Sequence, residues 1–188
     1  MHFQCGWAMI DHQHGDAGSF SWWRRGEWLT KERVGYGPYF ERSEQHNTLA
    51  IANERPQHAE DERRGGFWQS GSQWVLTQTA GPRFGPWIVT DEYAAAYCDA
   101  TPTYDSAYEG SNAVTRATRQ FLWLRPDVVL LHDRASTEAQ PGFIRFWLHT
   151  ASPPTLSPDR ATALNASGQR LEIYTLLPGR PERRAAAL

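Results

Sequence analysis

Short runs of β-branched and aromatic residues, separated by glycine and proline, limit most strongly how this chain can fold. No apolar segment with a helical period is longer than about ten residues. The strands predicted from these runs are 3–10, 19–24, 48–53, 73–79, 87–90, 113–124, 127–134, 143–150 and 170–177. Nine short strands are typical of a sandwich or a barrel, and we predict an all-β fold, an antiparallel β-sandwich.

The clearest strand pair is a hairpin in the second half of the chain. Arg125-Pro126-Asp127 supplies a turn between the apolar runs 113–124 and 127–134. Two other stretches, 57–66 and 150–158, are predicted to be exposed loops, because the first is highly charged and the second is rich in serine and proline.

A length of 188 residues favours a single domain. We assign residues 1–178 to this domain and expect 179–188 to be a disordered tail, because proline, arginine and alanine replace the core pattern there. Cys5 and Cys98 can form one disulfide or remain packed thiols, and the sequence leaves both open. Most of the nine tryptophans are expected to pack in the core rather than on sugars.

The charge balance argues against a nucleic-acid partner. The 19 basic and 21 acidic residues leave a formal net charge of −2, so the chain lacks the basic surface that phosphate-backbone binding requires. The longest aliphatic run, Val128–Leu131, is far shorter than the ~20 residues that span a bilayer. The start of the chain shows no secretion signal. We expect neither a nucleic-acid partner nor a membrane span.

The residues suited to chemistry are concentrated near the start of the chain. On an extended segment, the period of two places His12, His14 and Asp16 on one face. Two imidazoles and a carboxylate suit zinc and similar divalent ions, and His46 is the candidate for a further ligand from a second segment. The alternative is that these are ordinary surface histidines in a loop.

A cupin-like metal-dependent enzyme is one alternative. Gly6, followed after five residues by His12-X-His14, matches the opening of the cupin metal motif. Cupins place a glutamate four or five residues after the second histidine, where this chain has Gly18 and Ser19, and their second motif is absent before His46.

A longer series of motifs is more specific. Its first part comprises Phe3-Gln4-Cys5-Gly6, His12-Gln13-His14-Gly15-Asp16-Ala17-Gly18-Ser19-Phe20, Gly26-Glu27-Trp28-Leu29, Gly35-Tyr36 and His46-Asn47-Thr48-Leu49. Its later part comprises Asp99-Ala100-Thr101 with Tyr104, and Phe121-Leu122-Trp123-Leu124-Arg125-Pro126-Asp127 leading to His132-Asp133-Arg134. In order and approximate spacing, over roughly residues 3 to 178, this series resembles the heparinase II/III-like polysaccharide lyases.

The resemblance implies the C-terminal β-sandwich domain of a two-part enzyme, with an α/α toroid upstream and the substrate cleft between them. Such lyases cleave uronic-acid-containing polysaccharides, such as glycosaminoglycans or alginate, by β-elimination: the C5 proton is removed and the oxygen at C4 leaves. Most of the reacting groups come from the toroid, which this chain lacks, so we expect the chain to be inactive by itself. The family also implies a periplasmic or secreted location.

Residue by residue, the resemblance implies a role for each early histidine. His12 matches a histidine that faces the cleft and is the candidate catalytic residue, while His14 and His46 match two ligands of a structural zinc ion. The family's third ligand is an aspartate. Here Glu32 occupies that region, and Asp16 is its competitor.

Other polar residues have supporting roles in this interpretation. Asn47 is expected to hold the turn or to orient a zinc ligand. Arg24 and Arg42 are expected at the cleft rim, where they attract a uronate carboxylate. His132 and His149 lie in apolar runs and are interpreted as structural. The remaining hypothesis is a non-catalytic sugar-binding sandwich.

Overall fold

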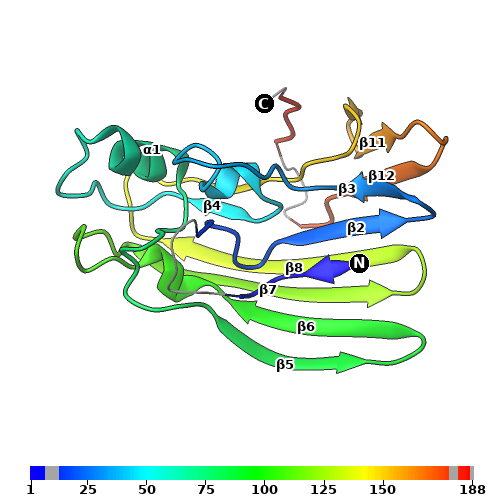
Figure 1. Cartoon of the computed structure of the whole chain (residues 1–188), viewed down its shortest axis with the longest axis horizontal. Coiled ribbons are helices and arrows are strands. Elements are labelled where there is room, and N and C mark those ends of the chain that lie inside the picture. Colours follow the sequence, from blue (N-terminus) through cyan, green and yellow to red (C-terminus); the bar gives the residue numbers. More distant parts are fainter. Residues whose placement is uncertain (7–12, 178–181, 187–188) are drawn as a thin grey trace.

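The predicted all-β fold is confirmed. The computed structural model describes residues 1–6, 13–177 and 182–186. Strands hold 38% of the residues and helices 9%, and every strand pair is antiparallel. The strands form several sheets in a sandwich-like arrangement, with the largest sheet in one half of the molecule and the small sheets in the other (Figure 1).

The largest sheet has four strands in the order β5-β6-β7-β8. They are β5 (Arg83–Val89), β6 (Tyr93–Asp99), β7 (Val114–Leu124) and β8 (Val128–Thr137). The predicted hairpin is confirmed as β7–β8, in which Leu124 pairs with Val128. Trp123 Nε1 donates to the carbonyl of Pro126 at 3.1 Å and so holds the turn.

Three small sheets make up most of the other half of the molecule. The first contains β1 (His2–Phe3), β2 (Phe20–Arg24) and β3 (Glu27–Thr30). The second pairs β4 (Leu49–Ile51) with β9 (Ile144–Phe146), and the third contains β10 (Thr155–Leu156), β11 (Arg160–Leu164) and β12 (Arg170–Tyr174). Two short 3-10 helices, η1 (Ser43–Gln45) and η2 (Thr101–Tyr104), connect strands.

The core lies between the two halves, against the inner face of the β5–β8 sheet. Alternation along β7 turns Ala117, Arg119 and Phe121 inward, where all three are buried. The Phe121 ring lies 4.8 Å from Phe3 and 5.9 Å from Phe20, centroid to centroid. Thr118 and Gln120 point the opposite way, to the outer face of the sheet.

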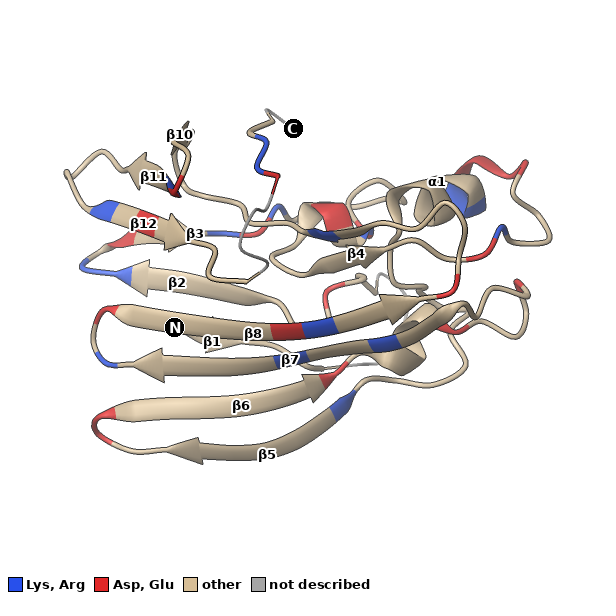
Figure 2. Cartoon of the chain, turned by 180° about the vertical axis from the view of Figure 1, so that it is seen from behind, with Lys and Arg blue, Asp and Glu red and all other residues tan. Residues whose placement is uncertain are grey.

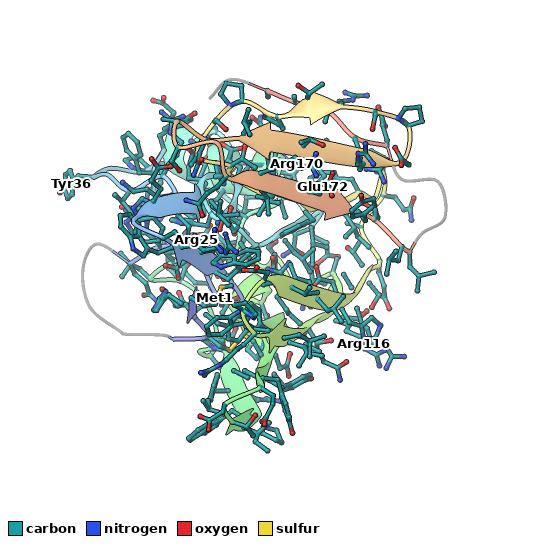
Figure 3. The ribbon with its side chains drawn as sticks, turned by 90° about the vertical axis from the view of Figure 1, so that its right-hand side faces the viewer. Met1, Arg25, Tyr36, Arg116, Arg170 and Glu172 are labelled. Carbon is teal, nitrogen blue, oxygen red and sulfur yellow. A yellow bond between two sulfur atoms is a disulfide. The ribbon has the colours of Figure 1, made fainter. Side chains whose placement is uncertain are left out.

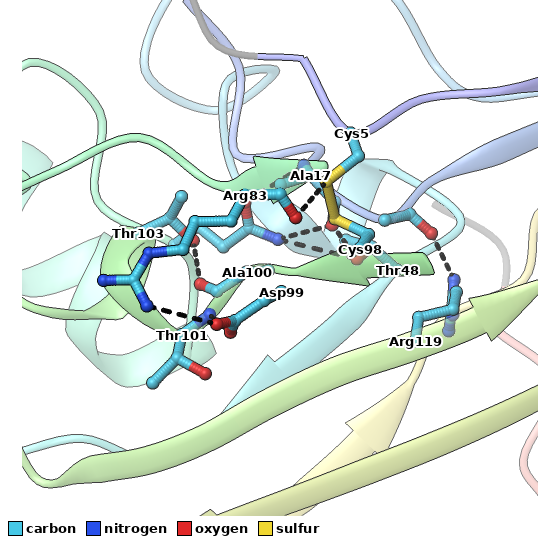
Figure 4. The surroundings of a disulfide bond; sticks show 12 residues. Cys5, Ala17, Thr48, Arg83, Cys98, Asp99, Ala100, Thr101, Thr103 and Arg119 are labelled. Carbon is cyan, nitrogen blue, oxygen red and sulfur yellow. Dashed lines mark hydrogen bonds and ion pairs between the residues drawn. A yellow bond between two sulfur atoms is a disulfide. The ribbon is translucent and has the colours of Figure 1, made fainter. Parts of the chain in front are cut away.

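A disulfide between Cys5 and Cys98 closes this core, so the two cysteines are not free thiols. It links the segment after β1 to β6 across a sequence separation of 93 residues, and both cysteines are buried (Figure 4). The start of the chain is therefore tied covalently to the largest sheet.

The strand predicted at 73–79 is wrong. Leu76 has a φ of 66°, in the left-handed region that extended strands do not use. Gln73 points inward, where its amide accepts from the backbone N–H of Ala17 and donates to the Ala17 carbonyl, both at 3.0 Å. Residues 73–79 have the apolar, alternating pattern of a strand but form a loop, because their side chains and main chain bond to other segments.

The exposed loop predicted at 57–66 is wrong at its end, where helix α1 (Glu62–Ser70) begins. Asp61 is its N-cap and accepts from the backbone N–H of Arg64 at 3.0 Å, and Gly71 ends it with a φ of 73°. These capping signals were present in the sequence, but the charged composition and the Gly65-Gly66 pair favoured a loop over a helix. No helix in the described part of the chain is long and apolar enough to cross a membrane.

Several strands were not predicted, including β3, β6 and β11. Strand β6 contains Ala94, Ala95 and Ala96, and alanine is depleted in strands. Its partners on both sides, β5 and β7, nevertheless pair with it along its length. The strand predicted at 3–10 begins near β1, but residues 7–12 lie outside the described residues.

Candidate metal centre

Four segments that are far apart in the sequence meet beside the inner face of the β5–β8 sheet. They are residues 13–19 before β2, 31–33 after β3, 43–48 around η1, and 147–150 after β9. Backbone hydrogen bonds join them: Gly15 N–H to Glu41 O, Arg33 N–H to Gln45 O, Lys31 N–H to His149 O, and Trp147 N–H to Thr48 O. The site is thus built on main-chain pairing rather than on free loops.

The segment 13–19 is irregular, so the prediction that it is extended, with alternate side chains on one face, does not hold for its described part. Gly18 has a φ of 80° and turns the chain. Gly15 is closely packed, since a Cβ there would lie 3.0 Å from the hydroxyls of both Ser43 and Ser72. These two glycines let the backbone pass close to η1 and place Asp16 inside the molecule.

Asp16, Glu32 and His46 converge on one point. One potential ligand atom from each of them lies within 4.8 Å of the others. The His46 ring is buried, and its Nδ1 lies 3.5 Å from Glu32 Oε2. The sequence left Glu32 and Asp16 as competitors for one ligand position, whereas the structure brings both carboxylates to the same histidine.

The two ring nitrogens of His46 have different surroundings. Nε2 lies 3.2 Å from the carbonyl of Phe40, which can only accept, and 3.1 Å from His14 Nδ1; in the tautomer with the proton on Nε2, it donates to that carbonyl. The buried Nδ1 has no hydrogen-bond partner among the described residues. In that tautomer, Nδ1 presents a lone pair towards the Glu32 carboxylate. Two facing acceptors need a cation or a proton between them.

Burial and charge act together on Asp16. Its carboxylate accepts from Gln4 Nε2 at 2.7 Å. Desolvation raises the pKa of Asp16 to about 6, with the Glu32 charge adding to the rise while His46 and the Gln4 hydrogen bond oppose it. Because burial is the main cause, the raised pKa reflects lost hydration, and a cation bound here would favour the ionised form of Asp16.

His14 is close to this group but lies on the other side of the His46 ring. Its Nδ1 is 3.1 Å from His46 Nε2, and the two rings meet edge to face with centroids 5.0 Å apart. Burial, followed by the neighbouring His46, lowers the pKa of His14. The Nδ1 of His46 faces Glu32, whereas its Nε2 faces His14.

Asn47 holds the ligand-bearing segments together. Its side-chain Nδ2 donates to the Phe20 carbonyl at 2.7 Å, and its Oδ1 accepts from the backbone N–H of His149 at 2.6 Å. Its backbone N–H points to Glu32 Oε1 at 3.4 Å. These contacts join the segment after η1 to β2 and to the segments after β3 and β9.

Arg119 connects the site to the β5–β8 sheet. Its Nε and Nη2 donate to the two carboxylate oxygens of Asp133 on β8, both at 2.7 Å. Its Nη1 donates to the carbonyls of Gly18 and Asn47, at 2.6 and 2.7 Å. One buried guanidinium therefore fixes the backbone next to Asp16 and His46 relative to the sheet.

His149, which the sequence suggested was merely structural, faces the same cluster. Its Nδ1 lies 3.2 Å from the acceptor Oδ1 of Asn47, so Nδ1 carries the proton, and its buried Nε2 has no hydrogen-bond partner among the described residues. Burial, followed by the His46 charge, lowers the pKa of His149 to about 4. No sequence signal marked this residue, because Trp147-Leu148 before it resemble a core strand.

The other predicted site residues lie elsewhere. His12 lies outside the described residues. Arg24 forms a two-pronged ion pair with Asp127 and also contacts Gln169, which ties β2 to the β7–β8 turn and leaves little of its guanidinium for a ligand. Arg42 packs near α1, lies 6.0 Å from the Tyr39 ring and is 3.8 Å from Glu44.

The donor set fits a zinc ion. Neutral imidazole and carboxylate oxygens are zinc ligands, and ligand atoms on a tetrahedral zinc lie about 3.4 Å apart. The 3.5 Å between His46 Nδ1 and Glu32 Oε2 is already close to this value. The hydrogen bond from His46 Nε2 to a backbone carbonyl is the support that metal-bound histidines usually have.

No protein-family model and no curated protein matches this chain. The function must therefore be argued from the chemistry of the cluster and from the order of the motifs in the sequence.

Proposed function

We propose that this chain is the β-sandwich portion of a lyase that cleaves uronic-acid-containing polysaccharides by β-elimination, with a structural zinc ion held by His46, Glu32 and Asp16. The order of its motifs, from Phe3-Gln4-Cys5-Gly6 to His132-Asp133-Arg134, resembles that of the heparinase II/III-like lyases. A secreted or periplasmic enzyme acting on an acidic polymer is the setting that this resemblance implies.

The observation that carries the proposal is the meeting of three predicted ligands. The sequence predicted His14 and His46 as ligands with Glu32 or Asp16 as the third, and His14 is not among the three that meet. Asp16, Glu32 and His46 lie in separate segments. Their ligand atoms nevertheless lie within 4.8 Å of one another, next to a buried histidine nitrogen that has no partner among the described residues. A cluster of unrelated surface histidines would not be expected to pack in this way.

Zinc in this position would supply order rather than acid chemistry. It would join the segment 13–19 to the end of β3 and to the residue after η1, so that the chain leading from His12 into the site is held firmly. Asn47 and Arg119 position the same segments by hydrogen bonds to the main chain. The buried carboxylates would then remain ionised with a cation as their partner.

The chemistry of elimination assigns a limited part to this chain. The reaction needs a base near C5, an acid near the leaving oxygen at C4 and a group that neutralises the carboxylate. In the proposal His12 faces the cleft and fills one of these roles by moving a proton, while a separate toroid domain supplies the others. The chain alone is then expected to bind the polymer without cleaving it.

Metal analysis tests the zinc site. The purified chain, dialysed against zinc and then against metal-free buffer, should retain one zinc per chain. Glu32→Gln should lose most of it, because an amide oxygen is a poor zinc ligand, whereas the exposed Glu92→Gln should retain it. Absence of zinc from the wild-type chain, or equal retention by both variants, would refute the assignment.

Binding and product assays test the reaction class. The chain should bind alginate or heparin oligosaccharides, His12→Ala should weaken this binding, and no ultraviolet absorbance from an unsaturated uronate should develop. Failure to bind any polyuronate would overturn the proposed substrate class. Turnover that His12→Ala abolishes would show that the chain contains the base and is active by itself.

A further inference from the structure

The outer face of the β5–β8 sheet carries an open polar groove of about 530 Å³. Its floor includes Tyr97 and Thr118, and its sides include Arg83, Asp99, Asp105 and Arg116. This volume is in the range of ordinary small-ligand sites, roughly 300–1,000 Å³. The metal centre lies behind the opposite face of the same sheet, because Arg119 points inward where Thr118 points outward, so the two sites are separate.

The groove is held in shape by fixed backbone. The Cys5–Cys98 disulfide (Figure 4) anchors β6 at Cys98, between Tyr97 and Asp99, whose side chains alternate with the buried Cys98 and so lie on the outer face. At the side of the groove, the backbone N–H of Thr79 donates to the Asp105 carbonyl at 2.6 Å. The Tyr97 ring lies over Gly85, where a Cβ would be 2.4 Å from Tyr97 Cδ1. A site that is already ordered loses little conformational entropy when a ligand binds.

Two charged groups in the groove have no partner among the described residues. No ion pair or side-chain hydrogen bond joins Arg116 or the Asp105 carboxylate to any residue in the described part of the chain. Arg83 and Asp99 form a long ion pair, at 3.8 Å, and the Asp99 carboxylate also accepts from the backbone N–H of Thr101 at 3.0 Å. Charged residues of the sheet gather toward this end (Figure 2), and the Arg116 side chain extends away from the ribbon (Figure 3).

These groups define the ligand by its chemistry. A free guanidinium matches a carboxylate in geometry and charge. Carboxylates, threonine hydroxyls and the Asn112 amide accept and donate hydrogen bonds as sugar hydroxyls require. Asp99 and Asp105 would repel the closely spaced phosphates of a nucleic acid, and the polar lining does not suit an apolar ligand.

We propose that this groove binds a uronic-acid residue of an acidic polysaccharide, with its carboxylate on Arg116, its hydroxyls on Asp99 and Asp105, and its ring against Tyr97. The choice of polymer rests on the proposed function, while the class of ligand follows from the groove itself. A second contact on the far side of the sheet would hold a long polymer on the protein while another part of it occupies the cleft.

An NMR titration of the full ¹⁵N-labelled chain tests this inference. An alginate hexasaccharide should shift the backbone amides of Tyr97, Asp99 and Thr118, whereas maltohexaose, an uncharged chain of equal length, should not at the same concentrations. Arg116→Gln should raise the Kd for the groove about tenfold, since a charge-assisted bidentate contact is lost. The Kd of Arg116→Lys should lie between those of the wild type and Arg116→Gln.

Arg125→Gln is the matched control, because Arg125 is an exposed arginine at the other end of the same strand pair. Equal affinities for Arg116→Gln and Arg125→Gln, or equal binding of maltohexaose, would overturn the groove proposal. Shifts confined to the amides around Asp16, Glu32 and His46 would also overturn it while supporting the proposed function. Shifts at the groove in a chain that retains no zinc would support the groove and count against the metal centre.

Discussion

The metal centre and the outer face of the β5–β8 sheet use polar side chains in opposite ways. In the metal centre, Asn47 and Arg119 are buried, and their hydrogen-bonding groups bind main-chain and side-chain partners. On the outer face, Arg116 lies open to solvent, with no ion pair or side-chain hydrogen bond to the rest of the described residues.

This difference shows how burial decides what a polar group can do. A buried donor or acceptor without a partner costs about 1–3 kcal/mol, so the few that remain in the metal centre, His46 Nδ1 among them, point to a missing ligand. An exposed group keeps its water and costs nothing, so Arg116 is free to exchange water for a carboxylate. An unpaired polar atom therefore indicates a bound ligand more strongly in the buried site than on the outer face.

The largest expected effect comes from cutting the covalent link between the two regions. Changing both cysteines, Cys5→Ala with Cys98→Ala, should lower the free energy of unfolding by about 4 kcal/mol, because the disulfide closes a loop of 93 residues in the unfolded chain. Urea denaturation of the variant and the wild type under non-reducing conditions measures the loss. A change below about 1 kcal/mol would show that core packing alone holds the regions together.

Arg119→Met removes the buried guanidinium that joins the metal centre to the β5–β8 sheet. It leaves the Asp133 carboxylate and the carbonyls of Gly18 and Asn47 without their donor, and we expect a loss of about 3 kcal/mol in the free energy of unfolding. Zinc affinity should fall as well, since the segments that carry Asp16 and His46 lose a common anchor. If thermal unfolding and zinc retention of Arg119→Met equal those of Arg125→Gln, the two regions are not coupled through this residue.

Removing zinc should destabilise the metal centre and leave the outer face of the β5–β8 sheet unchanged. At free zinc one hundred times its Kd, a bound ion adds about 2.7 kcal/mol to the free energy of unfolding, equal to about 8 °C in Tm for a chain of this size. Thermal scans with and without a chelator should show this shift in the wild type and in Arg116→Gln, but not in Glu32→Gln. An identical shift in Glu32→Gln would place the ion elsewhere.

The smallest effect is expected at the edge of the sheet. Trp87 on β5 is 66% exposed, so Trp87→Ala should change the free energy of unfolding by less than about 0.5 kcal/mol. Urea denaturation at two protein concentrations provides the measurement. A larger, concentration-dependent loss would mean that this edge is covered in solution.

The tryptophans show how far composition alone can lead. Trp22 and Trp74 are buried, as expected for core residues, but Trp23 is 48% exposed and Trp87 lies on an edge strand with both faces largely open. Residue type gives an average tendency to be buried. The position of each ring depends on whether another layer covers that part of the sheet.

Local pattern was sufficient for the β7–β8 hairpin and for β2 and β12, because a strand with one buried face imposes a period of two on its own residues, whereas the correctly predicted β4 is buried at all three positions. The same pattern failed at 73–79, and it missed β6, whose alanines pair between two stronger neighbours. Strand propensity is weak enough for tertiary contacts to override it.

The sequence by itself determined the all-β class, the hairpin and a set of candidate ligands, His14 and His46 with Glu32 or Asp16. Only the tertiary structure decided that both carboxylates approach one nitrogen of His46, that His14 lies at the other nitrogen, and that His149 faces the same cluster. The physical reason is distance along the chain. Periodicity acts between neighbouring residues, whereas the site is made by backbone pairing between segments that are about a hundred residues apart, as in the hydrogen bond from Trp147 N–H to Thr48 O.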